Sequence, residues 1–236
     1  MPKVGRMTPL PPVGRAQSLH RTGGAALITL IFADLVDLAT SLTMLLTDPN
    51  PSVLVEARQL LDLWTSPVAL STAAAALVLW FTPRHRAFIH MFDVTLGLSV
   101  LALTVNAVSL VASLFDRSAD PGFLLLSSTL VYVQNVAVFT AWYWRFDHRF
   151  RRDDADEESE HPALVFPHDS AGFRTLENWT PGIVDYVFLS FNTASTFGPT
   201  LPVPLRVSVQ LGMMLQVTIA ISVLGMLSAR AIGLIT

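Results

Sequence analysis

Two aspartates lie inside an otherwise apolar stretch near the start of the chain. Asp34 and Asp37 are three positions apart, so a helix would carry both on one face. Counted from residue 25 at about 1.5 Å per residue, they lie roughly 13 to 18 Å along that helix, near the middle of a bilayer. Each carboxylate costs about 2.5 to 3.5 kcal/mol or more at that depth. Two interpretations stay open: a proton or cation relay, or carboxyls satisfied by protonation or by hydrogen bonds to another helix.

Other polar side chains are expected at similar depth in later apolar stretches. They are Gln134, Asn135, Gln216 and Thr218, together with Asn106. With the aspartates they could line one aqueous path. Hydrogen bonds between helices, worth about 0.6 to 2 kcal/mol each, are the commoner explanation of intramembrane amides. We favour that explanation for most of them.

A third group of residues could coordinate an ion. It consists of Thr193, Ser195, Thr196, Phe197, Gly198, Pro199 and Thr200. Hydroxyl and carbonyl oxygens can replace the hydration shell of an ion in a channel filter. Proline holds φ at about −65°, and a β-branched threonine resists positive φ. A potassium-selective column of carbonyls is therefore not expected here.

The composition places these residues in a membrane protein. The chain has 236 residues, of which 52% are hydrophobic and only 14% charged, whereas soluble domains carry about 25% charged residues. Long uncharged stretches alternate with short charged clusters, as in membrane-spanning chains. The net charge of −3 gives no sign of a nucleic-acid partner, and the absence of cysteine excludes disulfides and thiolate metal sites. The expected partner is the lipid bilayer.

Five stretches are apolar and long enough, or nearly so, to cross a bilayer, which takes about 20 residues. They are residues 25–46, 67–81, 89–115, 123–144 and 205–229. The second is short unless residues 60–66 extend it. The apolar stretch at 182–196 is too short to cross and is typical of a re-entrant or interfacial segment. The sequence predicts an all-α integral membrane protein with about five transmembrane helices and one re-entrant half-helix before the last span.

The charged clusters divide the chain into three regions. Residues 1–24 contain four basic residues and no acid, which predicts a disordered tail on the cytoplasmic side. Residues 25–115 form the N-terminal transmembrane helices. Residues 116–236 form a channel-like module, in which an acidic surface linker at 146–180 separates the fourth span from the half-helix at 182–196 and the last span at 205–235. The positive-inside rule also places this linker on the cytoplasmic side.

Several motifs carry a resemblance to known families. The segment DYVFLSFNTASTFGPT resembles the pore loop of tetrameric cation channels, with Thr196, Phe197 and Gly198 at the filter positions. A resemblance that covers more of the chain rests on AWYWRFD, VFPHD, NWTPGIVDYVFLSFNTASTFGPTLPVPL and ARAIGLI. These pieces look like a widespread, functionally uncharacterised family of bacterial multi-span membrane proteins. The resemblance implies the bacterial inner membrane and a channel-like C-terminal module, and a homotetramer if that module is a channel. In that family an aspartate usually follows the Pro-Thr pair, where this chain has Leu201.

The functional hypothesis is a weakly selective cation or proton channel that passes a small ion. No phosphate-binding loop, nucleophile elbow or zinc signature is found in the sequence, so we expect no enzyme activity, no cofactor and no metal site. The alternative is a non-conducting scaffold or accessory subunit in which Pro199 plugs the filter-like segment.

Overall fold

The computed structural model of the protein is all-helical and describes residues 13–47, 53–113, 121–153, 162–167, 179–198 and 202–233. The elements are α1 (Val13–Thr47), α2 (Val53–Trp80), α3 (His85–Ala112), α4 (Pro121–Asp153), β1 (Leu164–Val165), α5 (Ile183–Thr196), β2 (Val203–Pro204) and α6 (Val207–Gly233). Among these described residues, four segments are long and apolar enough to cross a membrane: Thr22–Thr43, His85–Ala112, Leu124–Phe150 and Val207–Ser228. The predicted all-α membrane fold is confirmed, and the second predicted span has its shorter apolar part at Thr65–Trp80 in α2.

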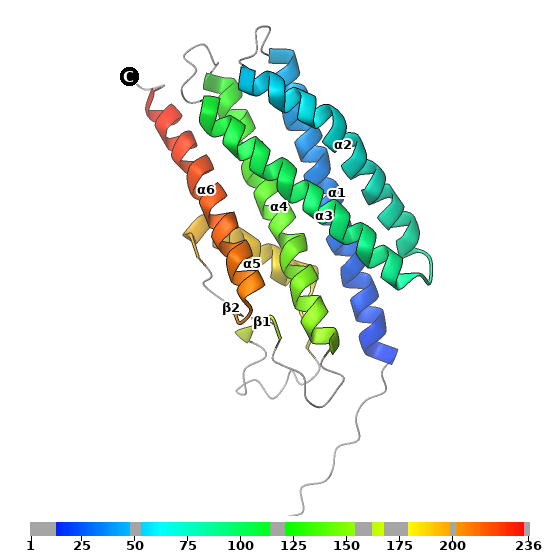
Figure 1. Cartoon of the computed structure of the whole chain (residues 1–236). Helices are drawn as coiled ribbons and strands as arrows, with labels where there is room; N and C mark the ends of the chain where they lie inside the picture. The colour runs from blue at the N-terminus through cyan, green and yellow to red at the C-terminus, as the bar shows by residue number, and fades with distance from the viewer. Residues whose placement is uncertain are drawn as a thin grey trace, which may run out of the picture.

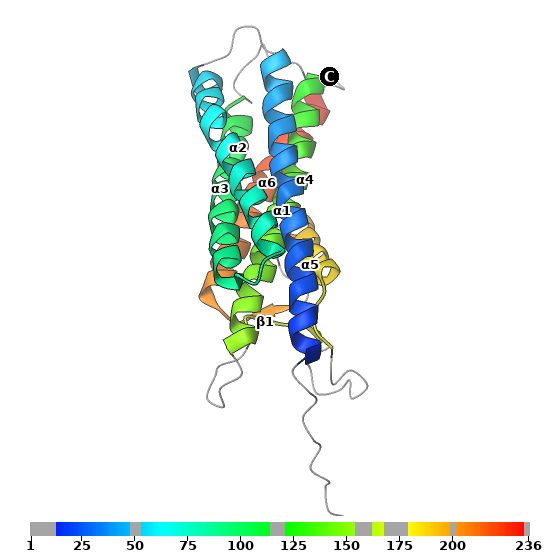
Figure 2. The ribbon, with the colours of Figure 1, turned by 90° about the vertical axis from the view of Figure 1, so that its right-hand side faces the viewer.

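The five long helices run up and down one elongated bundle (Figure 1). The first residues of α1 and the last residues of α6 lie at opposite ends of it. Figure 2 shows α1 and α4 side by side, with α2 and α3 paired next to them. Helix α4 is central, because it contacts α1, α3, α5 and α6. Arg145 on α4 forms an ion pair with Asp93 on α3, with Arg145 Nη2 2.7 Å from Asp93 Oδ2. This pair joins the basic end of α4 to the start of α3.

Three predicted boundaries are wrong. Helix α1 begins at Val13, within the predicted disordered tail, and residues 1–12 lie outside the described residues. Helix α4 continues to Asp153, into the predicted linker at 146–180, because Asp147 and His148 are buried rather than solvated. Pro67 lies inside α2 rather than at the start of a span. Membrane helices tolerate such a proline where neighbours satisfy the freed backbone groups.

Two short strands close a loop around α5. β1 precedes α5 and β2 follows it, and the two pair antiparallel with Leu164 opposite Pro204 and Val165 opposite Val203. The amide of Leu205 also donates to the carbonyl of Ala163 at 3.0 Å. Figure 1 shows this pair at the end of the bundle where α4 ends. The chain therefore leaves this end, forms α5 and returns to the same end before α6 crosses the bundle.

Candidate functional site

Helix α5 is the re-entrant helix predicted at 182–196, and its ends are set by local chemistry. The carboxylate of Asp185 accepts a hydrogen bond from the amide of Gly182 at 2.7 Å, and an acid in the first turn suits the positive end of the helix dipole. The helix ends at Phe197, which adopts the left-handed conformation with φ 58°. This conformation costs a non-glycine residue about 1 to 3 kcal/mol. The turn therefore stores strain at the position where the filter was expected.

The depth that α5 reaches follows from one contact. The hydroxyl of Ser190 donates to the carbonyl of Val136 at 2.8 Å. Val136 lies 15 residues after Pro121 and 17 residues before Asp153, the two ends of α4. Mid-α5 is thus level with the middle of α4, about 22 to 25 Å from either end of that helix. The segment is a true excursion into the bundle, neither a surface helix nor a full crossing.

A single buried carboxylate holds the base of the loop. Asp147 on α4 is fully buried. Its Oδ1 accepts the amide of Leu164 in β1 at 3.2 Å, and its Oδ2 accepts the hydroxyl of Tyr186 in α5 at 2.7 Å. Sequence reasoning missed this residue, because it was assigned to the acidic linker. Its place in the AWYWRFD motif was the signal that could have found it.

A polar cluster centred on Gln216 of α6 fixes the middle of α5. The Gln216 side-chain amide donates to the carbonyl and hydroxyl of Ser190 at 2.9 and 2.8 Å. Its carbonyl oxygen accepts the hydroxyl of Tyr143 at 2.5 Å, and its backbone carbonyl accepts the side-chain amide of Asn135 at 3.2 Å. All four residues are buried. This network fastens α5 to α4 and α6.

The hydroxyls of the filter-like segment bond mainly within their own helix, although the Ser195 hydroxyl also lies 2.9 Å from the hydroxyl of Tyr132 on α4. Thr193, Ser195 and Thr196 each donate to the carbonyl four residues earlier in α5, at 2.7 to 2.8 Å. Thr193 is buried, whereas Thr196 is exposed and Phe197 is half exposed. Gly198 is partly exposed, and its carbonyl is 2.9 Å from the Thr196 hydroxyl. The other two predicted filter residues, Pro199 and Thr200, lie outside the described residues.

The two early aspartates belong to a second cluster, between α1, α2, α3 and α4. Asp37 is 4% exposed. Its Oδ1 accepts the side-chain amides of Asn106 at 2.6 Å and Gln134 at 3.2 Å, and its Oδ2 lies 3.4 Å from the Ser66 hydroxyl. Asn106 also donates to the Gln134 oxygen at 2.9 Å. Asp37 is thus surrounded by neutral hydrogen-bond donors.

Asp34 is less completely satisfied. Its Oδ1 accepts the Ser99 hydroxyl at 2.6 Å, but its buried Oδ2 has no hydrogen-bond partner among the described residues, and neither has the buried Oδ1 of Asn106. An amide oxygen and a carboxylate oxygen can only accept hydrogen bonds, and the Asp34 oxygen could donate one only if that carboxyl were protonated. A buried acceptor without a donor calls for an explanation such as an ion or water. The Asp34–Asp37 cluster therefore contains two buried acceptor atoms without a donor among the described residues.

The six predicted intramembrane polar residues do not share one site. Asp34, Asp37 and Gln134 meet in the first cluster, and Asn135 and Gln216 meet in the second. Gln134 and Asn135 are adjacent on α4 and so point to different faces of it. Thr218 joins neither cluster: it is exposed on α6 and donates to the carbonyl of Met214. Within the described part of the chain, no group of three His, Cys, Asp or Glu residues is placed to hold a metal ion.

Comparisons of the chain with protein-family models, with curated proteins and with solved structures found no match.

Proposed function

We propose that the protein is a weakly selective cation or proton channel of the bacterial inner membrane, built from several copies of the chain, with the N-terminus in the cytoplasm. The observation that carries the proposal is the excursion of α5 to the middle of the bundle and back. Non-helical backbone at that depth cannot be satisfied by lipid and is stable only against protein or water. The turn at Thr196 and Phe197 faces outward in one chain, so a neighbouring copy or a water-filled pore must supply its partners.

The outer face of α6 supports assembly around an axis. Apart from Gln210, the exposed residues of its described part recur at alternating spacings of four and three, which places them on one face of the helix and defines the α6 seam. They are Val207, Leu211, Met214, Thr218, Ile221, Gly225 and Ser228. A side chain added at Gly225 would meet nothing within 4 Å in the single chain. We infer that this seam of α6 lines the pore.

The charge of the site favours cations. The C-terminal end of a helix carries a partial negative charge of about half an elementary charge, and this end of α5 lies at the exposed turn. Thr218 and Ser228 place hydroxyls on the α6 seam, where they can contact a hydrated ion. The strained Phe197 follows the last turn of α5 and would border the narrow part.

The proposal is tested by ion flux in vesicles that contain the purified protein. We expect K⁺, Na⁺ or H⁺ flux above empty vesicles, and loss of that flux in Thr218→Trp, which places a large ring on the α6 seam. The matched control is Leu101→Trp, because Leu101 is likewise exposed, at 52%, but lies on α3 and not on the α6 seam. Absence of flux, or equal flux in the two variants, would overturn the channel.

A non-conducting scaffold is the second candidate, and one observation favours it. The hydroxyls of Thr193, Ser195 and Thr196 bond back within α5, and that of Ser195 also contacts the Tyr132 hydroxyl of α4, so all three have partners within one chain. Because the chain has no cysteine, Gly198→Cys supplies a unique label site. The scaffold predicts a monomer in native lipid in which this cysteine is shielded from water-soluble maleimide. The channel predicts an oligomer in which it is labelled.

A further inference from the structure

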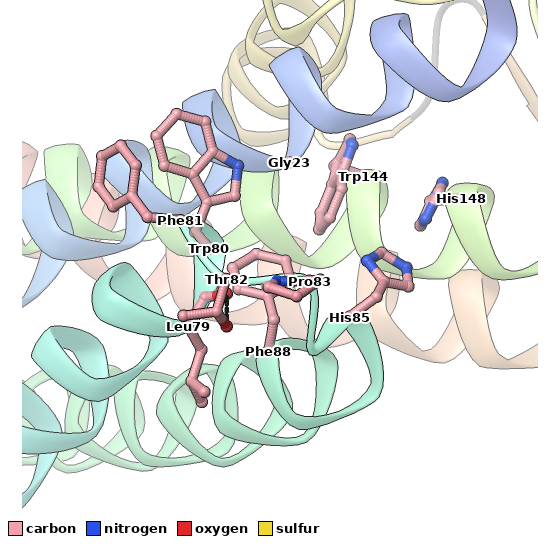
Figure 3. Close-up of a pocket in the computed structure, with 10 residues that line it drawn as sticks. All are labelled: Gly23, Leu79, Trp80, Phe81, Thr82, Pro83, His85, Phe88, Trp144 and His148. Atoms are coloured by element: carbon pink, nitrogen blue, oxygen red, sulfur yellow. Dashed lines mark hydrogen bonds between the residues drawn. The ribbon is translucent and has the colours of Figure 1, made fainter. Parts of the chain in front are cut away.

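A pocket of about 410 Å³ opens between α1, α2, α3 and α4 at the end of the bundle where α4 ends. Figure 3 shows the aromatic rings and two histidines that line it. Its main lining residues are Gly23, Trp80, His85, Phe88, Trp144 and His148. The volume lies within the usual range of small-molecule sites. This pocket is separate from α5 and α6 and plays no part in the proposed pore.

The walls of the pocket are fixed by ring packing. Trp144 stacks on His148 with ring centroids 5.2 Å apart and an angle of 9° between the planes. The edge of His85 faces His148 at 6.5 Å. A side chain at Gly23 would come within 3.3 Å of Trp144, and one at Gly24 within 2.5 Å of Trp80. The two glycines of α1 therefore allow both indoles to pack closely and shape the pocket.

The pocket lies where the apolar segments of four helices end. The apolar segment of α1 begins at Thr22, that of α2 ends at Trp80, that of α3 begins at His85 and that of α4 ends at Phe150. Indole rings also favour the membrane–water boundary. The pocket is thus level with lipid headgroups, which makes a lipid its natural occupant.

The electrostatics of the rim favour an anion. Helix α3 begins beside the pocket, its N-cap residue Arg84 makes no side-chain cap hydrogen bond, and its first turn has no acid. Arg84 and Arg86 are exposed and flank the lining residue His85 in the sequence. Neither arginine lines the pocket, but both add positive charge at the start of α3, the positive end of its dipole. The nearby Asp93 is neutralised by its ion pair with Arg145. Among the described residues, no carboxylate is paired with Arg84 or Arg86.

We propose that this pocket binds the headgroup of an anionic phospholipid. The phosphate lies toward His85, Arg84 and the first turn of α3, where the positive end of the helix dipole and the exposed cations come together. The glycerol and ester region lies along Trp80 and Trp144. A soluble phosphate compound could bind the same cations, but it would gain no binding energy from the aromatic wall at headgroup depth.

Native mass spectrometry tests this proposal. The protein is released from nanodiscs that contain equal amounts of phosphatidylglycerol and phosphatidylcholine, and the retained lipid is identified. We expect phosphatidylglycerol to be retained over phosphatidylcholine by about tenfold. Because both arginines are exposed, the double variant Arg84→Gln/Arg86→Gln should fold normally and lose most of this preference. His90→Ala is the matched control, because His90 is also exposed on α3 but lies beyond the first turn of the helix.

Three results would overturn the proposal. One is equal retention of the two lipids by the unaltered protein. Another is a lipid preference that does not distinguish the variants, either because the double variant retains phosphatidylglycerol as the unaltered protein does or because His90→Ala loses the preference equally. The third is full displacement of phosphatidylglycerol by excess inorganic phosphate, which would assign the pocket to a soluble anion. Vesicle flux is a separate readout, so failure of the channel proposal leaves this test unaffected.

Discussion

Replacement of Asp147 by alanine should release the re-entrant segment from α4. The carboxylate is fully buried and accepts hydrogen bonds from the amide of Leu164 at 3.2 Å and the hydroxyl of Tyr186 at 2.7 Å. These two donors come from β1 and from the start of α5, so one side chain ties both elements to α4. After the substitution both donors would remain buried without this acceptor.

The size of the effect follows from these bonds. Hydrogen bonds to charged groups contribute about 1.5 to 3 kcal/mol each, so Asp147→Ala should lower the free energy of opening of this segment by about 3 to 6 kcal/mol. Tyr186→Phe removes only one of the two donors and should cost about half as much. A domain is stable by only about 5 to 15 kcal/mol in total. Because the lost bonds hold only β1 and α5 to α4, the loop should open locally while the rest of the bundle stays folded.

Hydrogen exchange followed by mass spectrometry measures this opening. In Asp147→Ala, exchange of the α5 amides should accelerate by about a hundredfold to ten-thousandfold, since each 1.4 kcal/mol is a factor of ten. Thr218→Ala is the control, because its hydroxyl is exposed and bonds within its own helix. The reasoning is refuted if α5 exchange in Asp147→Ala stays within threefold of the control, or if α3 accelerates equally.

Further predictions concern single side chains in the bundle. Asp37→Asn should lower the free energy of unfolding in denaturant by about 1 to 3 kcal/mol, because it presents an amide to amide donors. Asp34→Asn should cost less, since one of its oxygens has no donor; the reverse order would contradict the cluster. Gly212→Ala should lower the free energy of thermal unfolding by about 1 to 3 kcal/mol, because the new methyl would lie 2.5 Å from an indole ring of α4. Gly225→Ala should raise it by about 0.5 to 1 kcal/mol, because the space around Gly225 is open. Equal effects at the two glycines would be incompatible with this packing. Tyr143→Phe should cost about 1 to 3 kcal/mol in the same assay, because a buried glutamine oxygen of α6 loses its donor, and an unchanged melting temperature would refute that bond.

Much of the fold could be predicted because membrane spans depend on local sequence. Length and apolarity alone located the crossing helices. The half-helix was predicted at 182–196 and lies at Ile183–Thr196, since Pro181 and Gly198 mark its two ends in the sequence. The missed start of α1 at Val13 and end of α4 at Asp153 lie beyond the apolar stretches. There, burial against other elements decides whether the helix continues.

The partners inside the bundle could not be predicted. Asp34 meets Ser99, which is 65 residues later in the chain, and such pairing depends on which helix faces are in contact. The adjacent amides of Gln134 and Asn135 make interhelical hydrogen bonds, the explanation favoured from the sequence, but their division between two clusters on different faces of α4 could not be predicted. The β1–β2 pair has only two residues in each strand, too few to show a periodic pattern. The anchoring role of Asp147 depends on that pair.

The most direct measurement concerns the return of the chain to the side from which α5 entered. Single cysteines at Thr180, before α5, and at Val203, after it, place labels on exposed positions of a chain without native cysteine. In oriented vesicles, a membrane-impermeant maleimide should label both from the same side, and Ser228→Cys near the end of α6 from the opposite side. Labelling of Thr180→Cys and Val203→Cys from opposite sides would make α5 part of a full crossing and would contradict the re-entrant loop.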